Sequence, residues 1–349
     1  MSQDATVNNK RIAKNTGGTY QSLAIPNMES PKFSICIPAY KARFLKEAVD
    51  SCLAQTYNNY EVIVVDDCSP ENLGEIMAVY KDNSRIRYYR NEQNCGAVNV
   101  VDNWNICLGY CTGDYVICMG DDDRLLPCCL EEYVNIIETH PGLGVYHAWT
   151  EIIDEKGDFI GMQAPRPELE GVFGLLWNRW NGRNKQYIGD FCYDVAKLKE
   201  DGGFFFLPMA WASDDITAVR AARYNGIANT QRICFQYRKH SLTISSSGSS
   251  DVKMEASLKE KEWYENFIKN EVKGEIENKY KTLVQQSIHQ HFRHKMKGEI
   301  TKDLGRGIYR VFHWLKVGRK YGFSSLSIID AFNDAVRRKF YERWRTCKV

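Results

Sequence analysis

The stretch Gly113-Asp-Tyr-Val-Ile-Cys-Met-Gly-Asp-Asp-Asp-Arg-Leu-Leu-Pro127 decides the fold class. Its apolar run from Tyr115 to Met119 is typical of a buried strand, because a strand covered on both faces reads as a continuous hydrophobic run. Three carboxylates follow where this strand ends, and Pro127 favours the first turn of a helix. The stretch therefore predicts a strand, an acidic loop and a helix in succession.

The residues before this stretch repeat the same alternation of strand and helix. Hydrophobic patterning predicts buried strands at 33–37, 61–65 and 86–89, helices at 44–55, 73–80 and 100–110, and a later strand at 143–153. Alternating strands and helices of this kind build an α/β fold with a mostly parallel central sheet flanked by helices. Ligands bind such sheets beyond the carboxyl ends of the strands, where the acidic clusters 66–67 and 121–123 are expected.

The sequence predicts three parts. Residues 1–30 are polar and lack an apolar period, so we expect a disordered or loosely attached tail. Residues 31–245 are expected to form the nucleotide-binding catalytic domain. A Ser-rich joint at 245–250 precedes a helical C-terminal region, 251–349, which is basic and amphipathic. The Asp66–Pro70 turn is expected to cap the helix that follows it.

Composition limits the classes of partner and compartment. The 349 residues are 44% hydrophobic and 26% charged, as in ordinary globular proteins. A formal net charge of +2 argues against nucleic acid as a partner. The 12 cysteines lack zinc-site spacing and indicate a reducing compartment. Without an apolar leader or an 18-residue apolar window, the expected location is cytoplasmic.

The sequence pattern at the C-terminal end is compatible with two roles for one helix. Residues 301–349 hold twelve Lys and Arg against four Asp and Glu, and apolar side chains recur every three or four positions at Ile329, Phe332, Val336, Phe340 and Trp344. A basic amphipathic helix of this kind either lies on the inner face of the cytoplasmic membrane, as a peripheral contact, or packs on its own domain.

Asp121, Asp122 and Asp123 are the candidate metal ligands. Adjacent carboxylates repel one another unless a cation or solvent compensates them. Hard cations such as Mn²⁺ or Mg²⁺ bind one or two carboxylates and complete their shell with phosphate oxygens, which neutralises charge on a diphosphate leaving group. The alternative is a solvated acidic turn that caps the next helix.

Three other constellations are candidates for chemistry. Asp66 and Asp67 can accept from a base or a ribose, and His240 can ligate a metal while Arg238 holds phosphate. Asp214 and Asp215 can supply a general base, because neighbouring acids raise one pKa towards neutrality. In the alternative, Asp66–Asp67 and Ser213 or Asp214 are helix N-caps and His240 ends a basic surface strand.

In order and spacing, these segments resemble the family-2 glycosyltransferases of GT-A fold. The resemblance covers about 33–245 and rests on ordered motifs. They are Ser34-Ile-Cys-Ile-Pro-Ala-Tyr40, Gln55-Thr-Tyr57, Tyr60-Glu-Val-Ile-Val-Val-Asp-Asp-Cys-Ser69, Asn94-Cys-Gly96, Asn103-Trp-Asn105, the Gly113–Pro127 stretch and, less closely, Gly202-Gly-Phe204 with Ser213-Asp-Asp215 and Arg220.

The resemblance implies residue roles. Counting back from Pro127 makes Asp122 the main metal ligand, with Asp121 and Asp123 beside it, while His240 stays a candidate ligand from its own segment. Counting back from Arg220 places the catalytic base on Asp214, with Asp215 as the other choice because Ser213 stands where the family often has Glu. The family's donor-contacting arginine is absent from 91–119, so Arg124, Arg238 or His240 would contact the diphosphate. The remaining implied donor contacts are Pro38, Ala39, Tyr40, Asp66, Asp67, Asn94, Gly96, Asn103 and Asp121.

The implied activity is inverting, metal-dependent transfer of a hexose or related sugar from a nucleotide diphosphate donor. The acceptor would be a hydroxyl of a glycan or lipid-linked glycan, as in surface polysaccharide assembly of the O-antigen or capsule type. Two alternatives differ in class. A nucleotidyltransferase would release pyrophosphate, although Pro38-Ala-Tyr-Lys-Ala-Arg43 lacks the glycines its loop typically has. A non-catalytic nucleotide-sugar-binding or scaffold protein would bind the donor without turnover.

Overall fold

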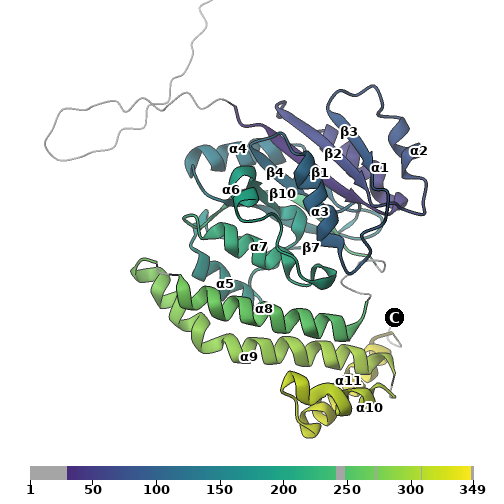
Figure 1. The fold of residues 1–349 in the computed structure, drawn as a ribbon, viewed down its shortest axis with the longest axis vertical. Helices are drawn as coiled ribbons and strands as arrows, with labels where there is room; N and C mark the ends of the chain where they lie inside the picture. The colour runs from purple at the N-terminus through teal and green to yellow at the C-terminus, as the bar shows by residue number, and fades with distance from the viewer. Residues whose placement is uncertain (1–29, 241–247, 272, 308, 347–349) are drawn as a thin grey trace, which may run out of the picture. The chain divides into compact units, whose positions relative to one another are not determined.

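The computed structural model describes residues 30–240, 248–271, 273–307 and 309–346. A central ten-stranded sheet carries helices on both faces (Figure 1). The strand order is β3-β2-β1-β4-β9-β6-β10-β5, with β7 paired to β6 and β8 to β10. The strands are β1 (Phe33–Ala39), β2 (Tyr60–Asp66), β3 (Ile86–Arg90), β4 (Tyr115–Cys118), β5 (Arg124–Leu125), β6 (Val145–Ile153), β7 (Phe159–Met162), β8 (Leu169–Glu170), β9 (Phe191–Asp194) and β10 (Ile227–Arg238). Most of the predicted tail and of the Ser-rich joint lies outside the described residues.

The helices follow the strands in alternation and then continue alone. They are α1 (Ala42–Leu53), α2 (Leu73–Ala78), α3 (Val100–Tyr110), α4 (Cys129–Thr139), α5 (Val172–Trp180), α6 (Val195–Glu200), α7 (Ser213–Ala222), α8 (Ser250–Asn270), α9 (Glu275–Arg306), α10 (Arg310–Val317) and α11 (Ser325–Thr346), with short 3-10 turns η1 (Ile188–Asp190), η2 (Pro208–Ala210) and η3 (Gly318–Tyr321). The helical region predicted for 251–349 begins with two separate helices, since α8 ends at Asn270 and α9 begins at Glu275.

The first half of the sheet is parallel, as the strand-helix alternation predicts. β1 lies between β2 and β4, with Ala39 opposite Asp66 and Cys36 opposite Cys118. The second half is mixed, because β9 runs antiparallel to both β4 and β6. The carboxyl ends of β1, β2 and β4 therefore meet at one edge, and the acidic loops follow there.

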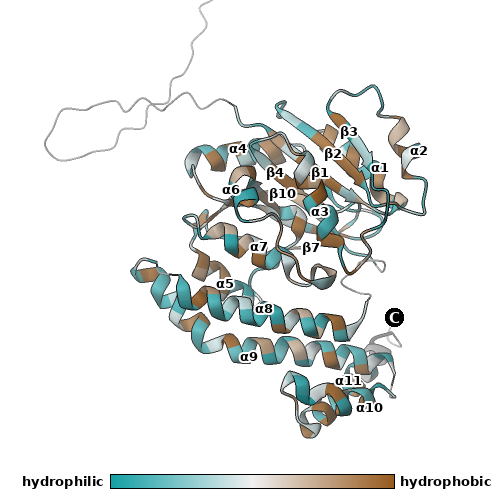
Figure 2. Cartoon of the chain, viewed as in Figure 1, coloured by the Kyte–Doolittle hydropathy of each residue, from teal (hydrophilic) through white to brown (hydrophobic). Residues whose placement is uncertain are grey.

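Both faces of the sheet are apolar, which is why its strands read as continuous hydrophobic runs. Phe33, Ile35 and Ile37 pack with α1 and α4 on one face. Cys36 and Ile63 pack with α3 on the other. The hydrophobic residues of β1, β2 and β4 accordingly lie inside the helix layers (Figure 2).

Two predicted helix starts are wrong. Pro127 lies two residues before α4 rather than in its first turn. Asn72 caps α2, accepting a hydrogen bond from the backbone N–H of Glu75 at 3.3 Å, so the Asp66–Pro70 turn does not cap that helix. The carboxylates of Asp66 and Asp67 are consequently available for other contacts.

Helices α8 and α9 pack together below the sheet, and α9 also contacts α5 and α11 (Figure 1). Tyr264 of α8, Phe292 of α9 and Trp314 of α10 join the same hydrophobic core as α3 and α5. The proposed boundary between a catalytic domain ending at 245 and a helical region starting at 251 thus crosses a continuous core.

The apolar stripe predicted on the last helix differs from the buried one. Ile328, Ala331 and Ala335 are buried, whereas Ile329 is 47% exposed and Val336 36% exposed. The small alanines allow α11 to lie close to its neighbours, a signal that a count of large apolar residues misses. The side chains of Phe340 and Trp344 lie outside those that the structure describes. None of the described helices is long and apolar enough to span a bilayer.

Candidate active site

Asp121 ties the end of β1 to the loop after β4. Its Oδ2 accepts hydrogen bonds from the backbone N–H groups of Tyr40 and Lys41, both at 2.7 Å. Burial, and after it the charge of Asp122, raises the pKa of Asp121 to about 6. Asp121 thus holds the predicted donor residues Pro38, Ala39 and Tyr40 beside the acidic loop.

Asp122 and His240 come together from distant parts of the chain. Nε2 of His240, just beyond β10, lies 2.6 Å from Oδ2 of Asp122. The His240 ring packs against Phe44, with ring centroids 5.6 Å apart. A carboxylate oxygen beside an imidazole nitrogen is a donor pair that divalent transition metals such as Mn²⁺ accept. Among the described residues, however, no group of three or more His, Cys, Asp or Glu side chains forms a ready metal cage.

Arg238 holds the acidic loop from the last strand of the site. Its backbone N–H donates to Oδ1 of Asp123 at 2.9 Å, and its Nε–H donates to the carbonyl of Asp122 at 2.8 Å. The buried guanidinium also pairs with Glu47 at 2.9 Å, and Glu47 pairs with Arg124 as well. The structure therefore gives both arginines protein partners, and their contact with a diphosphate stays a prediction.

The residues after β2 form a separate cluster at the same sheet edge. Buried Asp66 accepts from the Tyr88 hydroxyl at 2.8 Å and pairs with Arg90. Asp67 accepts from Nδ2 of Asn91 and from the backbone N–H of Cys95, both at 2.9 Å. Asp66 is enclosed by protein partners, so Asp67 is the better placed of the two to meet a ligand.

The amide residues of the Asn-Cys-Gly motif shape the loop around Asp67. Asn94 donates to the Asp67 carbonyl at 2.6 Å, and Gly96 adopts a φ of +82°, which favours glycine. Asn103 on α3 is buried, accepts from Asn91 at 3.0 Å and donates to the Val65 carbonyl at 3.3 Å. The three residues, which the sequence predicts to contact the sugar donor, lie together at the end of β2. Asn103 contacts Asn91 and Val65 there and so holds the loop in place.

Asp214 and Asp215 begin α7 but have different surroundings. Arg179 of α5 donates to both Asp215 oxygens, at 2.8 and 2.9 Å. Burial would raise the pKa of Asp215, but Arg179 outweighs it and holds that pKa below its usual range. Asp214 has no such partner: burial, and then the charge of Asp215, raises its pKa to about 7. The pair therefore contains one fixed carboxylate and one group that exchanges protons near neutrality.

The N-cap alternative for this segment is wrong. The residue before α7 is Ala212, and no side chain caps the helix there. The Ser213 hydroxyl instead accepts from the backbone N–H of Leu207 at 3.0 Å. Met209, Ala210 and Ala212 have φ values of 61°, 51° and 71°, a left-handed conformation that is strained for residues with a Cβ. Strain of this kind clusters at functional sites, and it here precedes Asp214.

One cavity of about 420 Å³ joins the acidic loop to α7. Asp123 lines one part of it, and Asp214 and Asp215 line another. The other lining residues are Val100, Trp104, Arg179, Gln186, Tyr187, Ile188, Met209, Ala210, Trp211, Ala212, Tyr237 and Lys295. The fold thus places a metal-motif carboxylate and a proton acceptor around the same open cavity.

The lining residues that sequence reasoning missed as site residues include Arg179, Gln186, Trp211 and Lys295. Trp211 adjoins the Ser-Asp-Asp motif, whereas Arg179 and Gln186 belong to none of the sequence motifs. Lys295 lies in the middle of α9, where no sequence motif marks it as a site residue. Its Nζ lies 2.5 Å from the Glu260 carboxylate on α8.

Comparison with known proteins agrees with this geometry. Residues 34–205 match the family model of glycosyl transferase family 2. This part of the chain belongs to glycosyltransferase family 2. The fold resembles the crystal structure of S. aureus TarS 1–349 with UDP-GlcNAc, with a TM-score of 0.57 at 16% identity, over 89% of this chain and 92% of that one. At that identity the likeness concerns the GT-A-type fold alone.

Curated relatives share part of the chain. An uncharacterized glycosyltransferase of Rickettsia felis is 34% identical over 142 residues, which are 40% of this chain and 23% of that protein. EpsE of Bacillus subtilis, also named as a glycosyltransferase, is 32% identical over 145 residues, or 40% of this chain and 51% of its own length. The match thus spans from about a quarter to half the length of these relatives.

Proposed function

We propose that this protein is an inverting, metal-dependent glycosyltransferase that moves a sugar from a nucleoside diphosphate to an acceptor hydroxyl. The observation that supports this best is the single cavity lined by Asp123 of the acidic loop and by Asp214, whose pKa is raised to about 7. A donor diphosphate at one part and an acceptor hydroxyl at the other would face each other across it.

The donor would bind at the ends of β1 and β2. Tyr40, which donates its backbone N–H to Asp121, and Asp67, which accepts from Asn91, would contact the base and the ribose. TarS, which shares the fold, was crystallised with UDP-GlcNAc and with UDP. Uridine diphosphate sugars are therefore the first donors to test.

Asp122 and His240 would hold the metal. Their oxygen and nitrogen donors fit Mn²⁺ well and Mg²⁺ less well, since Mg²⁺ prefers an oxygen shell. A bound divalent ion supplies positive charge that stabilises a departing diphosphate. Asp123 would stay on the backbone N–H of Arg238 and keep the loop in place.

Asp214 would be the catalytic base. Its carboxylate takes the proton of the acceptor hydroxyl as that oxygen bonds to the anomeric carbon, while the bond from this carbon to the diphosphate oxygen breaks. Attack opposite the leaving group inverts the anomeric configuration. Asp215 remains ionised on Arg179 and acts by raising the pKa of Asp214.

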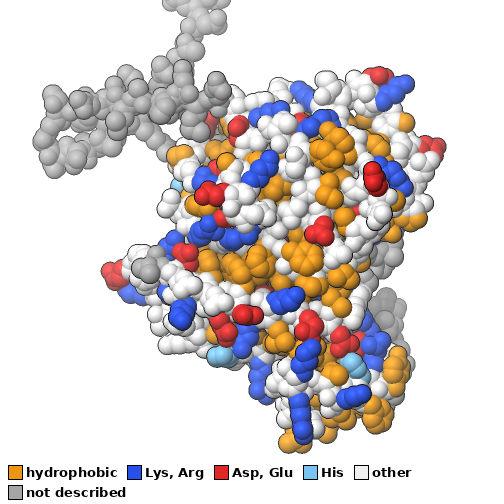
Figure 3. Space-filling model, in the orientation of Figure 1, with side chains coloured by type: hydrophobic (Ala, Val, Ile, Leu, Met, Phe, Trp, Pro, Cys, Tyr) orange, Lys and Arg blue, Asp and Glu red, His pale blue; other side chains and the backbone are white. Residues whose placement is uncertain are grey.

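The acceptor would be a glycan or lipid-linked glycan of a surface polysaccharide, reached at the inner face of the cytoplasmic membrane. The α10–α11 end exposes apolar side chains among Lys and Arg (Figure 3). The described ones include Tyr309, Phe312, Leu326, Ile329 and Tyr341. Apolar residues within a basic surface suit an anionic lipid interface.

A screen of nucleotide sugars with Mn²⁺ or Mg²⁺, with EDTA and Asp122→Ala as controls, tests the proposal. Turnover of one donor that EDTA and the substitution abolish is the expected result. Release of pyrophosphate would instead favour a nucleotidyltransferase. Donor binding without turnover, with acceptor extracts supplied, would favour a non-catalytic binding protein.

A further inference from the structure

Gln186 is a buried amide on the wall of the cavity. Its side chain is 6% exposed and lines the cavity together with Asp214 and Trp211. Neither its Oε1 nor its Nε2 has a hydrogen-bond partner among the described residues. Buried polar atoms are almost always hydrogen-bonded, and an unpaired one destabilises the fold. An amide unpaired at both ends therefore indicates a partner from outside the protein.

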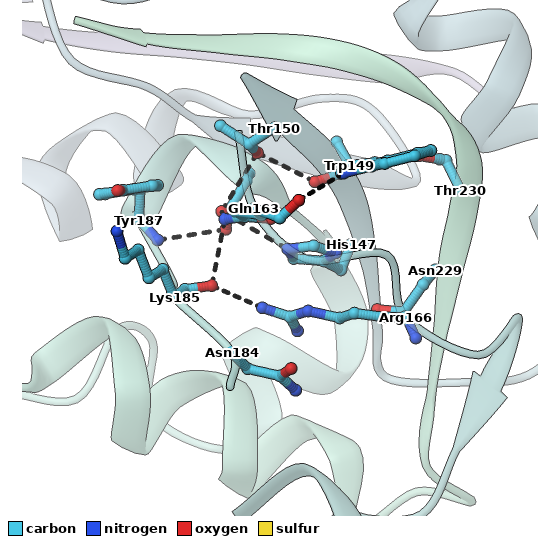
Figure 4. Close-up of polar contacts among 12 residues, drawn as sticks. His147, Trp149, Thr150, Gln163, Arg166, Asn184, Lys185, Tyr187, Asn229 and Thr230 are labelled. Carbon is cyan, nitrogen blue, oxygen red and sulfur yellow. Dashed lines mark hydrogen bonds and ion pairs between the residues drawn. The ribbon is translucent and has the colours of Figure 1, made fainter. Parts of the chain in front are cut away.

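The backbone beside Gln186 is fixed by buried side chains (Figure 4). The Lys185 carbonyl accepts hydrogen bonds from Arg166 Nη2 at 2.6 Å and from Gln163 Nε2 at 3.1 Å. On the other side, the Tyr187 ring stacks on Tyr237, with centroids 3.7 Å apart. Both neighbours of Gln186 are therefore held, which fixes the backbone position of this cavity-lining residue.

A second layer supports this arrangement. Fully buried Asp190 accepts from Gln163 Nε2 at 2.6 Å and from the Thr150 hydroxyl at 3.3 Å, and its Oδ1 accepts from the Tyr187 N–H at 3.3 Å. His147 lies behind it, 3.5 Å from Asp190. These hydrogen bonds tie the segment that carries Gln186 to Gln163 and Thr150.

The chemistry of the cavity selects the kind of ligand. An amide offers one donor group and one acceptor group side by side, and a hydroxyl both donates and accepts. The two cations that line the cavity are compensated, since Arg179 pairs with Asp215 and Lys295 with Glu260. Trp211 adds an aromatic surface to the same wall. A neutral, hydroxyl-rich ring fits these features better than an ionic group does.

We propose that Gln186 binds a hydroxyl of a sugar ring in this cavity and thereby selects that sugar. The assignment rests on the proposed function and names a specificity-determining residue for it. Two sugars enter such a cavity, the one carried by the donor and the one that receives it. Both offer the same hydroxyl chemistry, so the experiment separates them.

Gln186→Leu keeps the approximate volume and removes both hydrogen-bonding atoms. Affinities for a nucleotide sugar and for its free nucleoside diphosphate are measured by calorimetry with Mn²⁺. Binding of a panel of methyl glycosides is measured by saturation-transfer NMR with the diphosphate present. The matched control is Asn184→Leu, which removes a buried amide two residues away that is not among the cavity-lining residues.

Loss of one hydrogen bond to a hydroxyl should weaken sugar binding about tenfold in Gln186→Leu. If Gln186→Leu binds the nucleotide sugar more weakly but the free diphosphate equally well, Gln186 contacts the donor sugar. If the variant binds a methyl glycoside more weakly, Gln186 contacts the acceptor sugar. Asn184→Leu should change neither, and Gln186→Leu should not lower the midpoint of thermal unfolding, whereas loss of a structural amide would.

Equal affinities of Gln186→Leu and wild type for every sugar, or a clear fall in thermal stability, overturn the assignment. If the wild type binds the nucleotide sugar, and the variant binds this ligand and the glycosides as tightly as the wild type does, only the role of Gln186 is disproved. If the wild type binds no nucleotide sugar and no glycoside, the proposed function falls with it.

Discussion

Arg179 on α5 holds Asp215 on α7 by two parallel hydrogen bonds of 2.8 and 2.9 Å. The two bonds fix the orientation of the Asp215 carboxylate and its ionised state, because a guanidinium matches both carboxylate oxygens at once. Asp214, the next residue, then faces a permanent negative charge. Burial first, and the Asp215 charge after it, raise the pKa of Asp214, although the nearby Arg179 charge lowers it.

Breaking this ion pair should therefore destabilise the protein. Arg179→Gln leaves a buried carboxylate without its partner, and we expect a loss of about 2 kcal/mol in the free energy of unfolding, since Arg179 is partly exposed. Adding Asp215→Asn should restore part of the loss. Urea denaturation of the two single variants and the double variant measures the coupling. Lys279→Ala, which breaks the exposed pair with Glu275, serves as the control and should change little. Purely additive effects would contradict the prediction.

The rate of transfer should rise with pH through about 7. The deprotonated form of Asp214 is the base, and its pKa is raised to about 7. Below that pH, kcat/KM should fall about tenfold for each pH unit. A pH profile for wild type and for Asp214→Asn, which should lose transfer throughout the range, checks the assignment. A profile for wild type that is flat from pH 5 to 8 would exclude Asp214 as the base.

The same carboxylate should reduce stability at neutral pH. Its pKa in the folded protein, about 7, lies above the model-peptide value of 3.8, so the folded state binds this proton more tightly. The stabilisation is present below pH 4 and is lost as pH rises towards 7. Asp214→Asn should therefore be more stable than wild type at pH 8, by on the order of 3 kcal/mol, and nearly equal to it at pH 4. Denaturant curves at the two pH values decide this.

Manganese should stabilise the folded protein through Asp122 and His240. An ion at a hundred times its dissociation constant adds about 2.7 kcal/mol to the free energy of unfolding. Thermal shift with Mn²⁺ should show this for wild type and not for His240→Ala. The pair formed by His313 and Asp251 has a similar 2.9 Å geometry near the C-terminal helices, so His313→Ala is a matched control that should respond as wild type does. An equal shift in all three proteins would place the ion elsewhere.

Exposed apolar residues of the α10–α11 end should contribute to membrane binding. Phe312 is 74% exposed and Leu326 is 78% exposed. Replacing both with Ser should lower co-sedimentation with anionic vesicles by about tenfold, because each buried apolar side chain contributes roughly 1.5–3 kcal/mol and these insert only in part. Val79, 68% exposed at the end of α2, is the control position for substitution by Ser. Unchanged sedimentation of the double variant would remove the membrane from the proposal.

Much of the sheet is predictable from sequence because β1, β2 and β4 each have a local apolar pattern and a polar stop. β9 is different. Its four residues, Phe191–Asp194, lie between β4 and β6, and both of those neighbours are distant in sequence. Only tertiary packing makes this short segment a central strand.

The candidate site likewise combines residues that the sequence marks with residues that only the tertiary structure brings there. The sequence itself marks the segments whose ends or starts hold Asp67, Asp122, Asp214 and His240. Gln186 and Lys295 have no such signal. Their place on the cavity wall depends on how buried Asp190 and Gln163 hold a loop and on how α9 packs below the sheet.

Helix α9 keeps the transfer cavity at a fixed distance from α11. Lys295 lines the transfer cavity, and Lys297, two residues on, pairs with Asp330 and Asp334 of α11 at 2.6 and 2.9 Å. Residues two positions apart point to nearly opposite sides of a helix, so the width of α9, about 10–12 Å, separates the cavity from α11. If the α10–α11 end rests on a bilayer, α9 sets the height at which the cavity stands above the lipid. Acceptors would then be selected by reach, and glycans too short to span that height would not be extended.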